Sequence, residues 1–217
     1  METLPYFIFM CYNGQNQKGD DTMLLIKNGY IKTMAGSDIS GGSILIGDDG
    51  KIIAVAQEIA APDGAQVIDA EGRLVTPGCV DAHCHIGLDN EAMGWEGMDY
   101  NEMNDIVCPQ MRGIDGVKAM DPAFSHAVAG GVTTVCTGPG SANVVGGTFT
   151  VIKTVGKRVD TMVVREAAAM KCAFGENPKR CYREKGNSTR MSTAFQLRNM
   201  LFKAKEYAAK VDAATDY

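Results

Sequence analysis

Two histidines separated by one residue, His83 and His85, follow an apolar run and are the side chains of this chain best suited to metal chemistry. In an extended segment, residues i and i+2 point to the same side, so both imidazoles can reach a single metal ion. Cys84, between them, should point to the opposite side and is expected to be a core thiol rather than a ligand. A strand that ends in this pattern provides half of a metal site.

The residues around this pair resemble a known family. Residues 77–85 have the sequence Pro-Gly-Cys-Val-Asp-Ala-His-Cys-His, which is similar to the first barrel strand of the metal-dependent amidohydrolase superfamily. The resemblance implies an α/β fold, with a (β/α)8 TIM barrel preceded by a small β-sandwich. It implies that a metal-activated water hydrolyses a carbon–nitrogen bond, other than a peptide bond, in a small cyclic amide. Zinc is the expected metal, with iron or manganese as alternatives and one or two ions in the complete site.

Lys171 interrupts an apolar run over residues 167–174. Burying an unpaired amine costs several kcal/mol, so Lys171 needs either exposure or a function. It follows His85 by 86 residues (171 − 85), a separation similar to that in the dihydroorotase and hydantoinase branch, where a carboxylated lysine bridges two metals. The resemblance therefore makes Lys171 a candidate carboxylated ligand. A lysine that extends to solvent from a strand end is the alternative.

Glu176 is the rival to Lys171. It lies in the segment Gly-Glu-Asn-Pro-Lys-Arg over residues 175–180, which resembles a subgroup close to imidazolonepropionase. Glu176 is therefore an alternative metal ligand or a contact to the substrate.

The region before the histidines is rich in predicted strands. Four β-prone runs follow Met23: residues 24–31, 42–47, 51–55 and 65–70. Asp48-Asp49-Gly50 lies between two of these runs and predicts a hairpin. We predict a β-rich domain over 23–74, which resembles the family's flanking sandwich, and the N-terminal half of the barrel over 75–217.

After the histidines, the pattern changes to helix and strand. Asp121-Pro122 is typical of a helix start, the helix continues over 124–129, and Gly130-Gly131 ends it before a β-branched strand over 132–136. This order predicts a helix-to-strand step of an α/β fold. His126 lies in the helical stretch, so we interpret it as a packing or surface residue rather than a ligand.

A further helix is predicted near the C-terminus, with Ser192 or Thr193 as its cap. Its apolar residues recur at helical spacing on one face, which we expect to face the core. These residues are Leu197, Leu201, Ala204, Ala208 and Val211.

Residues 1–22 are interpreted as a disordered tail. Their apolar run over 6–10 is too short for a membrane span, and the segment lacks the features of an export signal. We therefore expect a cytoplasmic protein that does not contact a membrane.

The length predicts an incomplete barrel. From Val75 to the end there are 143 residues (217 − 74), whereas a (β/α)8 barrel takes about 250. The chain therefore looks truncated, and the family's late aspartate, which handles the proton, has no counterpart in it, so the catalytic residue is unknown. Such a chain would expose strand edges, and we expect a homo-oligomer or complementation by a missing C-terminal half.

The composition excludes some partners. The net charge is −5 and the sequence pI is about 5.2, so the chain lacks the basic field that a phosphate backbone requires and nucleic acid is not an expected partner. Seven cysteines form no Cys-x-x-Cys pair, which is typical of free thiols in a reducing compartment. A small-molecule amide is the expected partner.

Two alternative functions stay open at this stage. One is a non-catalytic, amidohydrolase-like assembly module, because the late ligands have no counterpart. The other is a deaminase of the same superfamily. The substrate is not named by these residues, since specificity in such barrels lies in loops after later strands.

Overall fold

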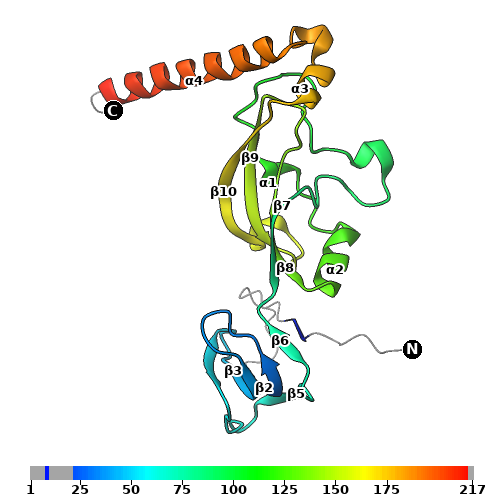
Figure 1. Ribbon diagram of the computed structural model, residues 1–217, viewed down its shortest axis with the longest axis vertical. Helices are drawn as coiled ribbons and strands as arrows, with labels where there is room; N and C mark the ends of the chain where they lie inside the picture. The colour runs from blue at the N-terminus through cyan, green and yellow to red at the C-terminus, as the bar shows by residue number, and fades with distance from the viewer. Residues whose placement is uncertain (1–7, 10–21, 215–217) are drawn as a thin grey trace. The chain divides into compact units, whose positions relative to one another are not determined.

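The computed structural model describes residues 8–9 and 22–214 (Figure 1). The chain divides into two compact units. The first holds the described residues up to Asp81 together with Phe124–Val135 and Lys153–Met162, and the second holds Ala82–Ala123, Cys136–Ile152 and the described residues from Val163 onward. The predicted boundary at residue 74 stays a prediction.

The first unit contains a six-stranded sheet in the order β1-β6-β2-β3-β4, with β5 also paired to β2. Its strands are β1 (Ile8–Phe9), β2 (Leu24–Ile31), β3 (Ile39–Ile46), β4 (Ile52–Ala56), β5 (Gln66–Asp69) and β6 (Leu74–Thr76). The strands β2, β3 and β4 are antiparallel neighbours, whereas β5 and β6 run parallel to β2. Apart from β1 and Thr22, the predicted tail over residues 1–22 lies outside the described residues.

The predicted strands and hairpin of this unit are confirmed. The turn between β3 and β4 closes through a 2.9 Å hydrogen bond from the Gly50 amide to the Gly47 carbonyl, and Gly50 adopts φ 71°, which favours glycine. β-branched residues from several strands then pack together as the core. The buried members of this core are Ile26, Ile31, Ile44, Ile46, Ala70 and Val75.

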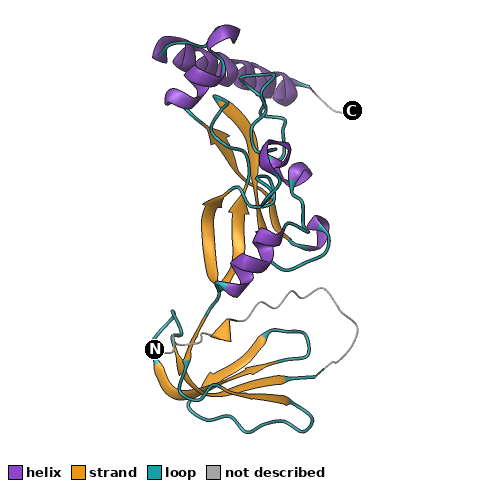
Figure 2. Cartoon of the chain, turned by 90° about the vertical axis from the view of Figure 1, so that its right-hand side faces the viewer, coloured by secondary structure: helices purple, strands orange, loops and turns teal. Residues whose placement is uncertain are grey.

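Four further strands, among those drawn in orange in Figure 2, form a second sheet. Their order is β10-β9-β8-β7, and Figure 1 labels them. They are β7 (Cys79–Cys84), β8 (Val132–Thr137), β9 (Val145–Lys153) and β10 (Val163–Cys172). The division between the compact units falls within β7, β8 and β9, so each unit contains part of these strands.

Helix α2 (Pro122–Ala129) precedes β8, as the sequence predicts. The Asp121 carboxylate accepts a 3.0 Å hydrogen bond from the Ala123 amide, and Gly131 ends the helix with φ 82°. The mixed α/β fold is thus confirmed.

The hairpin of β9 and β10 differs from the expected all-parallel barrel. These two strands are antiparallel, and residues 154–162, with the short 3-10 helix η2 (Val159–Thr161), connect them. A parallel crossover needs about a dozen residues or more, usually a helix. The connection is too short for that, so the chain turns back directly.

The remaining helices are short, except the last. They are η1 (Gly94–Gly97), α1 (Gly113–Gly116), α3 (Glu176–Cys181), η3 (Arg183–Lys185) and α4 (Arg190–Ala213). The C-terminal helix is confirmed, but its cap is Thr189, which forms a capping box with Ser192, rather than Ser192 or Thr193. No helix within the described ranges is both long and apolar enough to cross a membrane.

The prediction that one face of α4 lies in the core is wrong for the described residues. Leu201 is 54% exposed and Val211 is 52% exposed, and Ala204 and Ala208 are also exposed. Helical periodicity predicts an apolar face, but that face becomes buried only where another element covers it.

Candidate metal centre

His83 and His85 stand together where β7 ends. Their ring centroids are 5.1 Å apart, and the rings meet edge to face at 80°. His83 is exposed and His85 is half-buried. The Cys84 thiol lies 3.8 Å from the Cys136 carbonyl oxygen, as expected for a side chain that alternates with the two imidazoles. The structure therefore brings both histidines to one place.

The main chain of the loop after β8 orients the imidazole of His85. Its Nδ1 atom lies 2.8 Å from the Gly138 carbonyl oxygen. Since a carbonyl only accepts, Nδ1 must carry the proton, and the lone pair of the neutral ring is then on Nε2. The Tyr100 ring stacks on His85 at 5.3 Å and 22°. Metal-binding histidines commonly have their second nitrogen held in this way.

Lys171 comes to the same place from β10. Its Nζ atom lies 3.1 Å from Nε2 of His83 and 5.5 Å from the centroid of the Phe149 ring. Partial burial of the amine lowers the pKa of Lys171 below its ordinary value. The amine is thus half-buried and lies beside His83, and its role as a carboxylated ligand stays a prediction.

Phe149 of β9 lies beneath these three groups. It is 4% exposed, and its ring centroid is 5.2 Å from that of His83 and 6.4 Å from that of His85. Gly138 must remain a glycine, because a Cβ there would lie 2.6 Å from Cγ of Phe149. The site thus has an apolar base.

Glu176 and His126 both belong to helices. Glu176 begins α3, and its 85% exposed side chain pairs with Lys179 at 2.6 Å. His126 is part of α2, the helix that the sequence predicts for it. Whether either residue is a ligand stays a prediction. Among the described residues, no group of three or more His, Cys, Asp or Glu side chains is arranged to hold a metal ion. A three-ligand centre made of the described residues alone would therefore need a donor of another type, such as Lys171.

The loop over residues 138–143 connects the site to a second loop, over residues 100–105. The Gly140 amide donates to the Tyr100 carbonyl at 2.5 Å, and the Ala142 amide donates to the Asn101 side chain at 3.0 Å. The buried Asn143 amide donates to the carbonyls of residues 102 and 105 at 2.7 and 2.8 Å. These contacts hold Tyr100 in place against His85.

Tyr182, which follows α3, completes this network. Its buried hydroxyl lies within hydrogen-bond distance of the Glu102 carbonyl, of the Asp105 carbonyl at 3.0 Å and of the Asn143 side-chain nitrogen at 2.8 Å. Sequence reasoning missed Tyr100, Asn143 and Tyr182. The available signal was the glycine-rich loop over residues 138–141, which indicates close backbone approach but does not name the segment that approaches.

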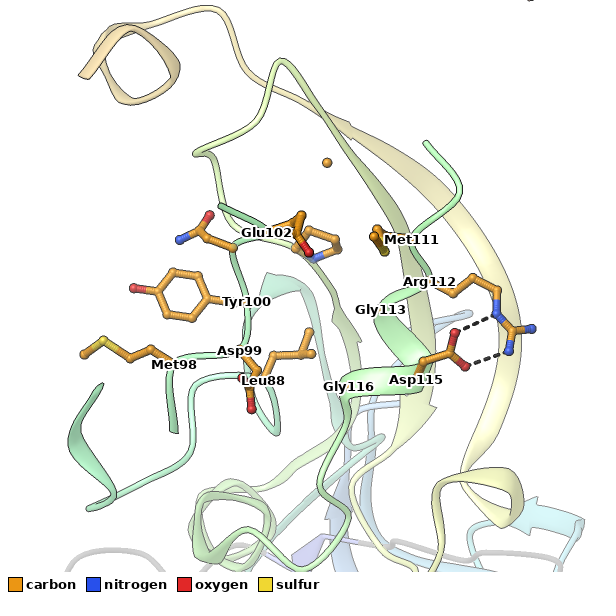
Figure 3. A pocket seen from close by; sticks show the side chains of 13 residues that line it. Leu88, Met98, Asp99, Tyr100, Glu102, Met111, Arg112, Gly113, Asp115 and Gly116 are labelled. Atoms are coloured by element: carbon orange, nitrogen blue, oxygen red, sulfur yellow. Dashed lines mark hydrogen bonds and ion pairs between the residues drawn. The ribbon is translucent and has the colours of Figure 1, made fainter. Parts of the chain in front are cut away.

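A cavity of about 410 Å3 has Tyr100 in its lining (Figure 3). Tyr100 lines it and also stacks on His85. Gly146 lines it as well, and a Cβ on this glycine would lie 3.6 Å from Cγ of Lys171. The cavity therefore shares Tyr100 with the surroundings of His85 and Gly146 with those of Lys171, and its volume is that of a small-molecule pocket.

Several known proteins are similar to this chain in sequence. No family model matches the chain. The chain is 34% identical over 188 residues to amidohydrolase tasK of Hapsidospora irregularis, a match that covers 79% of this chain and 19% of that protein. It is 33% identical over 117 residues to the dihydroorotase of Anaeromyxobacter dehalogenans, which covers 54% of this chain and 22% of that enzyme.

A solved structure matches over most of the chain. The amidohydrolase from Thermotoga maritima MSB8 superposes with a TM-score of 0.84 and 42% sequence identity, covering 88% of this chain and 50% of that one. Fold and sequence thus agree on one class, the amidohydrolases. The chain belongs to the amidohydrolase superfamily and spans half the length of this solved relative.

Proposed function

We propose that the complete protein hydrolyses a carbon–nitrogen bond, other than a peptide bond, in a small amide by means of a divalent metal. The ligands would be Nε2 of His83, Nε2 of His85 and a carboxylated Lys171. The observation that carries the proposal is the 3.1 Å separation between Lys171 Nζ and His83 Nε2. It supports a three-ligand centre at a point where the sequence alone provides two.

The donor set fits a metal of intermediate softness. Two imidazoles and one carboxylate oxygen are ligands that zinc accepts, and iron or manganese are alternatives. When bound, the metal supplies a Lewis acid and a water that ionises near pH 7. A cyclic amide is the proposed substrate, and the names of relatives such as dihydroorotase are compatible with this class.

The chain's own residues prepare the site. The Gly138 carbonyl keeps the proton of His85 on Nδ1, and Tyr100 limits rotation of that ring. Phe149 excludes water beneath the histidines. Carboxylation of Lys171 joins its neutral amine to carbon dioxide, forms one nitrogen–carbon bond and releases one proton.

A non-catalytic assembly module is the second candidate. Exposed aromatic side chains on α4 favour it, since Phe195 is 57%, Phe202 61% and Tyr207 70% exposed. This function predicts no dependence on the metal centre, so the same experiment separates the two candidates.

The test is the metal content of the 217-residue chain after incubation with zinc, iron or manganese and removal of free ions. We expect the wild type to retain metal and the double variant His83→Asn with His85→Asn to lose it. His126→Asn is the matched control, because it removes the remaining histidine outside the site. Equal metal content in the wild type and the double variant would favour the assembly module.

A further inference from the structure

The charge of the cavity beside His85 is predominantly negative. Asp99, Glu102 and Asp115 line it together with Arg112. Figure 3 shows that Arg112 turns toward Asp115, whereas Glu102 lies on the Tyr100 side. The lining therefore presents carboxylates near the site and a guanidinium that is directed elsewhere.

The guanidinium of Arg112 is already neutralised. Its Nε and Nη2 atoms donate to Asp115 at 2.9 and 2.6 Å, and its Nη1 atom donates to Glu166 at 2.7 Å. Each of its three nitrogens thus has a carboxylate partner, and the contact to Asp115 is bidentate. These partners raise the pKa of Arg112, and Arg112 lowers the pKa of Asp115. To bind Arg112, a substrate carboxylate would have to displace Asp115 or Glu166.

The other walls of the cavity are apolar and suit an uncharged part of a substrate. Leu88 is 3% exposed, and Met111 and the Tyr100 ring add further apolar surface to the lining. The Glu102 carboxylate accepts a 2.7 Å hydrogen bond from the Asn104 amide, which fixes its position. Among the residues that line the cavity, an anion therefore meets the carboxylates of Asp99 and Glu102, and the cation of the lining, Arg112, is already paired.

We propose that this cavity binds the substrate and selects neutral or cationic amides over amides that carry a carboxylate. This inference rests on the proposed hydrolase function for the identity of the site. The selection follows from the neutralised Arg112 and from the carboxylates of Asp99 and Glu102, which attract a positive group and repel a negative one.

The test measures binding to the metal-free full chain, because a carboxylate probe could bind directly to a metal. Three probes share one side chain: leucinamide, protonated at about pH 6, the neutral N-acetylleucinamide and the anionic N-acetylleucine. Titration calorimetry at low salt measures the dissociation constants, and we expect that of leucinamide to be lower than that of N-acetylleucine by about threefold or more. The ratio should shrink at high salt, because ions screen the carboxylates.

Charge variants locate the effect. Glu102→Gln should reduce the preference for leucinamide. Asp160→Asn is the matched control, because it removes the same charge from η2, outside the lining, and should leave the preference unchanged. Asp115→Asn combined with Glu166→Gln should free Arg112 and tighten N-acetylleucine about threefold or more.

The variant Arg112→Gln with Asp115→Asn keeps the proposal testable if the first double variant unfolds. It removes the guanidinium together with its bidentate partner in the lining, so the net charge of the lining and the affinity for N-acetylleucine should stay unchanged. Weaker binding of N-acetylleucine to this variant, stronger binding of N-acetylleucine than of leucinamide to the wild type, or binding of none of the probes would overturn the proposal. These titrations use the metal-free chain, so their result does not depend on the metal centre. Whether His83 and His85 bind a metal is decided separately, by the metal content of the wild type and of the double histidine variant.

Discussion

The Nδ1 atom of His85 lies 2.8 Å from the carbonyl oxygen of Gly138, and this contact determines which ring nitrogen can bind a metal. Because the carbonyl requires a donor, the proton stays on Nδ1 and the lone pair stays on Nε2. Gly138 therefore has two roles. Its carbonyl orients His85, and the absence of a side chain leaves room for Phe149.

Gly138→Ala should destabilise the fold and weaken metal binding. The new Cβ would lie 2.6 Å from Cγ of Phe149, so the loop or the ring must move, at a cost of about 1–3 kcal/mol. Urea unfolding measures the change in the free energy of unfolding. Gly175→Ala is the control, because its Cβ would meet nothing within 4 Å. Equal stability of the two variants would show that the packing around Gly138 is loose.

Tyr182→Phe should lower the free energy of unfolding by about 1–3 kcal/mol. The change removes a buried hydroxyl and leaves the carbonyls of Glu102 and Asp105 with fewer partners. Tyr207→Phe alters a tyrosine that is 70% exposed and should have almost no effect. Chemical denaturation of both variants makes the comparison, and a negligible effect at Tyr182 would contradict the network described around Asn143.

Stability should fall at alkaline pH. Burial raises the pKa of Cys108 to about 11 and the pKa of Tyr182 to about 12. A raised pKa means that the folded state keeps its proton while the unfolded state loses it near pH 8.5 for cysteine and 10 for tyrosine. The stabilisation is thus fully present below about pH 8.5 and is lost progressively as the pH rises toward 12.

Denaturation curves from pH 7 to 12 measure this loss. Cys108→Ala should flatten the early part of the decline, whereas Cys79→Ala, at an exposed thiol, should leave it unchanged. A decline that is the same in both variants would assign the alkaline transition to other groups.

The 217-residue chain alone should show negligible hydrolase activity. The proposed centre holds a metal through three groups, and the proton acceptor that the reaction requires has not been found among them. Turnover of cyclic amides, and of N-acyl amino acids, should be compared with that of a longer chain extended to the length of the solved relative. Similar turnover by both chains would show that these residues are sufficient for catalysis.

The parts of the site that were predictable are those that depend on short spacing. His83 and His85 are two residues apart on a strand, and strand geometry alone places them together. Lys171 required the family resemblance, since nothing local connects residues 85 and 171. Tyr100 and Tyr182 act through contacts to loops about 40 to 80 residues away, and local patterns carry no signal for such contacts.

The same distinction holds for the fold. The strands and turn around Gly50 follow from local propensity and were predicted. The antiparallel return of β10 along β9 depends on how many residues connect them, and the exposure of the α4 face depends on which elements cover it. Neither property is contained in the periodicity of the segment itself.

The most direct measurement is an anomalous difference map of crystals of the chain loaded with zinc in bicarbonate. The proposed centre predicts one peak within about 2.0–2.2 Å of Nε2 of His83, Nε2 of His85 and a carboxylate oxygen on Lys171. A zinc peak bound through Nδ1 of His85, a zinc peak distant from both histidines, or an unmodified Lys171 that does not contact the bound metal would contradict it.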